Sequence, residues 1–209
     1  MHNIFYARFY RTNGDACLTI YISTTNGRAF FYFVNLLKSI KLKYKIEVPK
    51  QSMDIKGLYL TTDCEKCNDL TSITFEELSK DEILDKIKIF QCLYSRKNIQ
   101  LGIDPGYRIG IAVTIENRPV HMDIMNNTQE VIGLVSRLSA AELGNLDIKI
   151  GDGRPEITQK IIDGLRPIVK SHDLIQVVNE KRTTPKGRAR VKKDMVAAYH
   201  IAMKRGLTI

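Results

Sequence analysis

The 209-residue sequence has no apolar run long enough to cross a membrane. Its longest apolar stretches, such as residues 29–37, are far shorter than the roughly 20 residues that a membrane-spanning helix requires. The opening residues MHNIFYARFYRTNGD also lack the charged, apolar and small-residue order of a secretory signal peptide. We therefore expect no membrane-embedded segment and a cytoplasmic protein.

Cysteine is scarce, and all four cysteines lie in the N-terminal half of the chain. In a reducing cytoplasm a disulfide framework is the weaker interpretation. Cys64 and Cys67 form a C-x-x-C pair, and Cys17 and Cys92 could complete a tetrahedral Zn²⁺ site if the fold brings all four together. The alternative is that they are ordinary buried or surface thiols.

Internal repeats are also lacking, and the composition of 44% hydrophobic and 26% charged residues is that of a globular protein. The length allows one large domain or two small ones. The net charge of +9 is uneven, because residues 1–95 hold 13 Lys/Arg against 11 Asp/Glu, whereas residues 96–209 hold 19 against 12. An excess of positive charge in the second half favours a polyanionic partner, most simply nucleic acid.

Residues 1–95 predict a small α/β module. Aromatic and β-branched runs around Asn13-Gly14 predict an antiparallel hairpin, and apolar spacing after it predicts a helix. Thr74 followed by Glu77 has the spacing of a capping box and predicts the start of a second helix. The expected elements are strands 3–11 and 16–24, a helix over 28–41, strands 43–48 and 57–62, and a helix over 74–90.

Residues 96–209 predict a second domain, which begins at the polar segment SRKN. Three strands, 99–104, 108–116 and 119–125, are expected to form an antiparallel meander. A regular alternation of helices and strands then predicts parallel strands joined by crossover helices. These later elements are a helix over 128–143, a strand over 147–152, a helix over 155–170, a strand over 173–180 and a final helix over 191–204.

Acidic residues stand where predicted strands end. Asp104 ends one apolar strand and Asp152 another, and if these are parallel neighbours both carboxylates lie at the same sheet edge. Asp194 shares a helix face with Ala197 and Ala198, whose small side chains would let that face pack closely on the sheet. Three carboxylates gathered there repel one another unless they are protonated or bridged by a hard cation such as Mg²⁺ or Mn²⁺. Turn, capping and surface roles are the simpler alternatives.

Four segments carry a family resemblance: LGIDPGYRIGIAV, IKIGDGRPE, VNEKRTTP and KKDMVAAYHIA. They resemble the motifs of the RuvC and YqgF families of the ribonuclease H-like superfamily. The resemblance implies a ribonuclease H-like mixed sheet, in which a three-strand antiparallel meander is joined by parallel strands with flanking helices. It implies catalytic roles for Asp104, Asp152, Glu180 and Asp194, with Asp104, Asp152 and Asp194 as metal ligands.

A basic segment, KRTTPKGRARVKK, separates Glu180 from Asp194. Beside an acidic metal centre it would contact the phosphates of a nucleic acid, although a solvated loop is the simpler interpretation. The expected nucleic-acid-binding residues are Lys181, Arg182, Lys186, Arg188, Arg190, Lys192 and Lys193.

These features together predict a metal-dependent endonuclease that hydrolyses phosphodiester bonds in branched DNA, as Holliday junction resolvases do, or in structured RNA. Resolvases of this class act as dimers, so a homodimer would favour a junction substrate. The alternative is a catalytically inactive nucleic-acid-binding protein with the same fold. A sugar-kinase or actin-like ATPase is disfavoured, because the chain is too short for the two lobes that such a protein requires.

Overall fold

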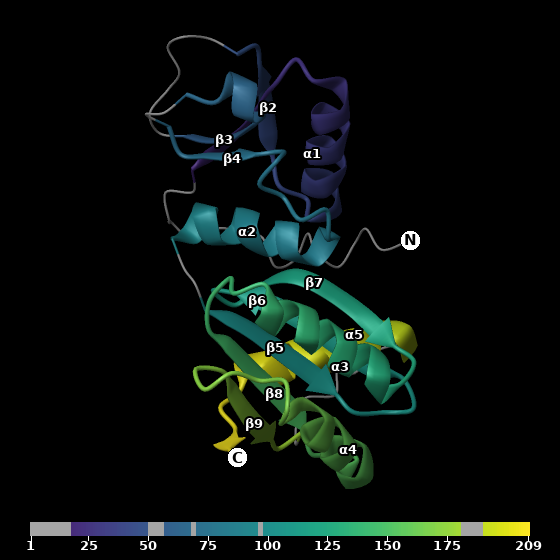
Figure 1. Cartoon of the computed structure of the whole chain (residues 1–209). Coiled ribbons are helices and arrows are strands. Elements are labelled where there is room, and N and C mark those ends of the chain that lie inside the picture. Colours follow the sequence, from purple (N-terminus) through teal and green to yellow (C-terminus); the bar gives the residue numbers. More distant parts are fainter. Residues whose placement is uncertain (1–17, 50–56, 68–69, 96–97, 181–189) are drawn as a thin grey trace. The chain divides into compact units, whose positions relative to one another are not determined.

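The computed structural model describes residues 18–49, 57–67, 70–95, 98–180 and 190–209, with side chains in the last stretch from Lys193 onward. The chain forms two compact units, Met1–Arg96 and Lys97–Ile209. Each contains a β-sheet and α-helices (Figure 1). Within the described ranges, no helix has the length and apolar character needed to cross a bilayer.

The N-terminal unit is built on a four-stranded sheet with the order β2-β1-β3-β4, in which every pairing is parallel. Strand β1 has a parallel neighbour on each side, so its predicted antiparallel hairpin is wrong; the expected partner, residues 3–11, lies outside the described ranges. The elements are β1 (Thr19–Ser23), α1 (Gly27–Ser39), β2 (Tyr44–Glu47), β3 (Gly57–Thr61), η2 (Asp63–Glu65), β4 (Ser72–Thr74) and α2 (Glu82–Tyr94).

The predicted capping box of Thr74 and Glu77 does form, but it closes a turn and does not start a helix. The Thr74 backbone N–H donates to the Glu77 carboxylate at 3.2 Å, and the Glu77 N–H donates back to the Thr74 hydroxyl at 3.3 Å. Helix α2 begins eight residues later than expected, where Asp81 accepts hydrogen bonds from the N–H groups of Ile83 and Leu84. A local capping pattern is therefore satisfied without a helix after it.

The C-terminal unit is an α/β structure whose six-stranded mixed sheet has the order β10-β9-β8-β5-β6-β7. Parallel pairings join β9, β8 and β5, whereas β6, β7 and β10 run antiparallel to their neighbours. The elements are β5 (Ile99–Asp104), β6 (Ile109–Ile115), β7 (Arg118–Met125), α3 (Thr128–Ala140), β8 (Leu146–Gly151), α4 (Pro155–Leu165), β9 (Leu174–Val178), α5 (Arg190–Met203) and β10 (Leu207–Thr208).

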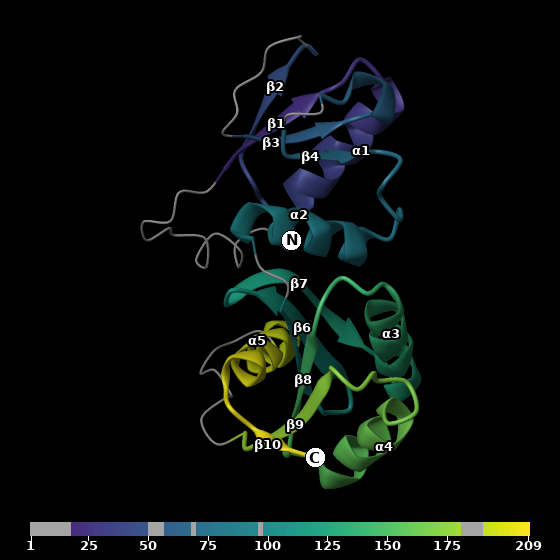
Figure 2. The same cartoon turned by 60° about the vertical axis from the view of Figure 1, so that its left-hand side comes forward.

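Helices cover both faces of this sheet. Figure 2 shows α5 on one face and α3 and α4 on the other. Because both faces are covered, β5 and β6 are buried along almost their whole length, which explains why their sequences are nearly continuous apolar runs. The predicted meander and the predicted alternation of helices and strands are confirmed in this unit.

Candidate active site

Three parallel strands of the C-terminal sheet end side by side. Ile103 pairs with Ile150, and Gly151 pairs with Val178, so the last residues of β5, β8 and β9 lie at one edge. Asp104 is the final residue of β5, Asp152 directly follows β8, and Glu180 follows β9 after one intervening residue. This carboxyl edge is where open α/β sheets place their ligands.

Glycines in the sheet let α5 approach the same edge. A Cβ atom on Gly110 would lie 2.2 Å from the main-chain oxygen of Asp194, and one on Gly102 would lie 2.0 Å from that of Ala198. Gly110 is the cross-strand partner of Asp104. The Asp104 side chain therefore lies on the sheet face that α5 covers, close to Asp194. The small residues of α5 had predicted this close packing.

These carboxylates act on one another electrostatically. Burial, followed by the negative charges of Glu180 and Asp194, raises the pKa of Asp104 to about 7. Near neutral pH, Asp104 is therefore protonated in a large fraction of molecules. We call Asp104, Asp152, Glu180 and Asp194 the acidic cluster.

Glu180 is held against the turn that follows β8. Its carboxylate fills the space beside two glycines, since a Cβ on Gly151 would lie 1.9 Å from one of its oxygens and a Cβ on Gly153 would lie 2.1 Å from the other. The pKa of Glu180 is raised, mainly because the side chain is partly buried. The hydrogen bond from the Gly153 N–H lowers this pKa, the charge of Asp152 raises it, and the charge of Lys204 lowers it.

Asp152 and Asp194 occupy different positions in the cluster. Asp152 is exposed, and its side chain accepts a hydrogen bond of 2.9 Å from the Glu180 backbone N–H. Asp152 thus fixes the strand end that carries Glu180. Asp194 is partly exposed and lies 3.4 Å from the Arg108 guanidinium, which partly neutralises it.

The fit of this site to a metal ion rests on its donor chemistry. Carboxylate oxygens are the ligands that Mg²⁺ and Mn²⁺ prefer. Burial, and then the charges of Glu180 and Asp194, raise the pKa of Asp104, and a bound cation would favour its ionised form. In the side-chain positions of the described residues, no three or more His, Cys, Asp or Glu groups gather closely enough to hold a metal. Binding would therefore require side-chain rotations.

The structure describes only some of the residues that were predicted to bind zinc or phosphate. Cys64, Cys67 and Cys92 are free thiols, and Cys17 lies outside the described residues, so the proposed tetrahedron stays a prediction. Of the basic segment, Lys193 is described and partly exposed. Lys181, Arg182, Lys186 and Arg188 lie outside the described residues, as do the side chains of Arg190 and Lys192.

Two exposed residues beside the acidic cluster, Tyr107 and Arg154, contact each other, which the sequence did not indicate. The Arg154 guanidinium carbon lies 4.0 Å from the centre of the Tyr107 ring, although the two residues are far apart in sequence. Tyr107 directly follows the IDPG motif, and Arg154 directly follows GDG. Their place next to these predicted site motifs was the sequence signal that could have identified them.

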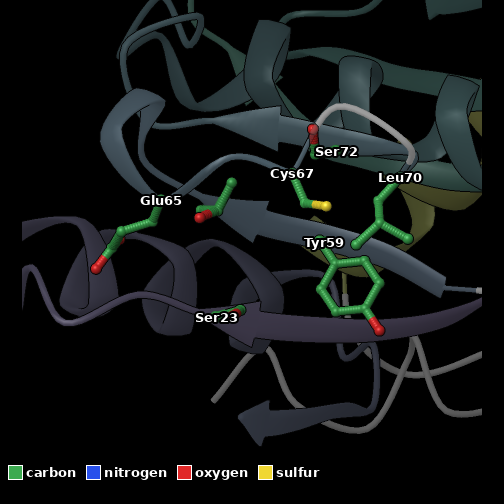
Figure 3. Close-up of a pocket in the computed structure, with 7 residues that line it drawn as sticks. Ser23, Tyr59, Glu65, Cys67, Leu70 and Ser72 are labelled. Carbon is green, nitrogen blue, oxygen red and sulfur yellow. The ribbon is translucent and has the colours of Figure 1, made fainter. Parts of the chain in front are cut away.

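The N-terminal unit contains a narrow pocket at the carboxyl ends of β1 and β3 (Figure 3). After β1 the chain adds β2 on one side and later β3 on the other, so the pocket lies at a topological switch point. Its empty space is about 180 Å³, counting solvent at its mouth. Buried hydroxyl oxygens of three lining residues have no hydrogen-bond partner in the described structure: Ser23, Thr61 and Ser72.

Glu65 lines this pocket, and its carboxylate accepts hydrogen bonds from the segments that follow β1 and β3. It accepts hydrogen bonds from the Thr25 N–H at 2.7 Å and the Thr62 hydroxyl at 2.6 Å, and one from the Thr24 hydroxyl. Burial raises the pKa of Glu65, but these hydrogen bonds outweigh it and lower the value to about 2. An ionised, fully bonded carboxylate is unsuited to proton transfer near neutral pH, so the acidic cluster is the stronger catalytic candidate.

Comparison with models of protein families and with curated protein sequences finds no match to this chain. The chemistry of the acidic cluster is therefore inferred from its own residues.

Proposed function

We propose that the C-terminal unit is a ribonuclease H-like domain of the RuvC/YqgF kind and that the protein is a metal-dependent endonuclease acting on branched DNA or structured RNA. One observation carries the proposal: a partly buried carboxyl group, Asp104, ends the central strand β5 and is electrostatically coupled to Glu180 and Asp194. A carboxyl group whose pKa is raised in this way lowers the stability of the folded protein when it ionises, and strongly shifted pKa values are typical of functional sites.

The strand topology supports the same interpretation. The order β7-β6-β5-β8-β9, with the first three strands antiparallel and the last three parallel, is the arrangement that the ribonuclease H-like resemblance implies. Helix α5 then returns to the central strands and brings Asp194 to their carboxyl edge. The acidic cluster thus draws on the ends of three strands and on α5.

Each residue of the cluster has a distinct role in this proposal. Asp104, Glu180 and Asp194 would hold Mg²⁺ or Mn²⁺, which when bound activates water and stabilises the leaving oxygen in phosphodiester hydrolysis. Asp152 positions Glu180 through the backbone hydrogen bond to one of its carboxylate oxygens, and its other oxygen would be available for the ligand role predicted from the sequence. Arg108 holds the Asp194 carboxylate and competes with a cation for it.

The charge distribution favours a nucleic acid as the substrate. The basic segment lies between Glu180 and Asp194 in the chain, so the residues on either side of it both belong to the acidic cluster. Lysine and arginine side chains placed there would contact phosphates and offset the repulsion between the cluster and a polyanion.

The direct test is cleavage of labelled four-way junction DNA, duplex DNA and hairpin RNA by the full chain with Mg²⁺ or Mn²⁺. We expect metal-dependent cleavage that Asp104→Asn reduces to background. Asp123→Asn is the matched control, because Asp123 lies on β7 with 57% of its side chain exposed. Absence of cleavage with every substrate, or full activity of Asp104→Asn, would overturn the proposal.

A second candidate is a nucleic-acid-binding protein without catalytic activity. The Arg108–Asp194 ion pair and the absence of a ready-made metal group among the described residues favour it. This candidate predicts tight nucleic-acid binding that Lys186, Arg188 or Arg190 substitutions weaken and Asp104→Asn leaves intact, with no metal-dependent cleavage.

A further inference from the structure

Tyr107 presents an aromatic ring to solvent beside the acidic cluster. It lies in the connection between β5 and β6, three residues after Asp104, and is 85% exposed. It is the most exposed large hydrophobic residue of the described structure, and Phe31, at 68%, is the other exposed aromatic. A ring this exposed contributes little burial to folding, so stability gives no reason for its position.

Arg154 is stacked against this ring. It lies between the turn after β8 and the first residue of α4, and its guanidinium carbon is 4.0 Å from the ring centre of Tyr107. No ion pair of Arg154 is present in the described parts of the chain, and its side chain does not cap α4. The contact thus joins the connections that follow β5 and β8, the strands that end at Asp104 and Gly151.

We propose that Tyr107 and Arg154 form a stacking platform for an unpaired base of a nucleic-acid strand whose backbone lies at the acidic cluster. The proposal rests on the nuclease function above and narrows its substrate to nucleic acids with unpaired nucleotides, at a junction, a loop or a single strand. Bases inside an intact duplex already stack on their neighbours and do not present a free face to the platform.

The local charges favour a base over an isolated anion as the occupant. Asp152 and Glu156 flank Arg154 in the sequence and disfavour a lone phosphate there. A base needs no net charge to stack, because every base has a π-face that packs on an aromatic ring or on a planar guanidinium. DNA and RNA bases share this chemistry, so the platform itself does not select the sugar.

The test measures stacking separately from cleavage. The full chain is titrated, with EDTA present, into single-stranded, bulged and fully duplex oligonucleotides of DNA and RNA that carry one 2-aminopurine, whose fluorescence falls on stacking. We expect quenching with the unpaired substrates, and an affinity for them that Tyr107→Leu lowers by about 5- to 100-fold. Tyr107→Phe retains the affinity, and duplex affinity changes less than about twofold.

Phe31→Leu is the matched control, since it removes an exposed aromatic ring from the N-terminal unit and is expected to leave quenching unchanged. Equal affinity of Tyr107→Leu and the unsubstituted chain for unpaired substrates would overturn the platform, while metal-dependent cleavage would still support the nuclease. Tyrosine-dependent quenching without cleavage under any metal would support the platform and refute the nuclease. Equal losses of affinity in Tyr107→Phe and Tyr107→Leu would show that the hydroxyl group binds the substrate and would contradict stacking.

Discussion

Asp104→Asn is expected to stabilise the C-terminal unit at neutral and alkaline pH while abolishing cleavage. The folded protein binds the Asp104 proton more tightly than the unfolded chain, because its pKa rises from the ordinary value of 3.8 to about 7. The associated stability is fully present below pH 3.8 and is lost as the pH rises through 7. Asparagine keeps a similar shape and carries no charge at any of these pH values.

The size of the effect follows from the same shift. Each pH unit between the two pKa values corresponds to 1.36 kcal/mol, so the ionised Asp104 carboxylate costs up to about 4 kcal/mol above pH 7. Solvent access to a partly buried carboxyl group reduces this figure. We therefore expect Asp104→Asn to raise the free energy of unfolding by about 2–4 kcal/mol at pH 8 and by less than about 0.5 kcal/mol near pH 4.

Amide hydrogen exchange followed by mass spectrometry provides the assay, because peptides from β5 and β6 report on the C-terminal unit alone. The measurement is made with EDTA at several pH values, with Asp123→Asn as the exposed control. Adding Mg²⁺ at pH 8 is then expected to stabilise the unsubstituted chain and not Asp104→Asn. Equal or lower stability of Asp104→Asn at pH 8 would refute the electrostatic account of the cluster.

Four substitutions test other parts of the structure, with hydrogen exchange followed in peptides of the unit that carries each substitution and with cleavage followed where activity is concerned. Gly151→Ala is expected to leave the fold intact but to displace the Glu180 carboxylate and reduce cleavage. Gly133→Ala is the control, because its new Cβ meets no other part of the structure within 4 Å. We expect it to raise the free energy of unfolding by about 0.5–1 kcal/mol and to keep activity. Gly102→Ala meets a backbone oxygen of α5 at 2.0 Å and is expected to cost about 3 kcal/mol; no loss would contradict the packing. Thr61→Val removes a buried, unpartnered hydroxyl and is expected to gain about 1 kcal/mol, while a loss would indicate a bound partner in the pocket.

The sequence predicted the C-terminal unit well because its signals agree with one another. The apolar runs that end at Asp104 and near Asp152 correspond to β5 and β8, since a sheet covered on both faces needs continuous apolar strands. The alternation of helix and strand left few ways to connect them. The final helix and its small-residue face also follow the prediction.

The N-terminal unit was predicted less well, because local signals there have more than one structural solution. The Thr74 and Glu77 pattern satisfies its hydrogen bonds in a turn, and Asp81 takes the role of helix cap. Strand β1 was expected to pair antiparallel, yet parallel partners flank it on both sides, and strand pairing of this kind depends on contacts distant in sequence.

Details of the candidate site depended on tertiary contacts that no motif contains. The metal-ligand role predicted for Asp152 stays a prediction; nothing in the sequence indicated that its carboxylate also accepts a hydrogen bond from the Glu180 backbone, or that Glu180 acts electrostatically on Asp104. The stacking of Arg154 on Tyr107 joins two loops that the sequence separates by more than a third of the C-terminal unit. Exposure and stacking of this kind follow from the sheet register, which the sequence did not specify.

Metal binding by the acidic cluster is tested by soaking a crystal of the full chain in Mn²⁺ and measuring the anomalous scattering. We expect Mn²⁺ between Asp104 and Asp194, with Glu180 as a further ligand. An acidic cluster without Mn²⁺ at concentrations that support cleavage, or Mn²⁺ bound only elsewhere in the chain, would contradict this expectation.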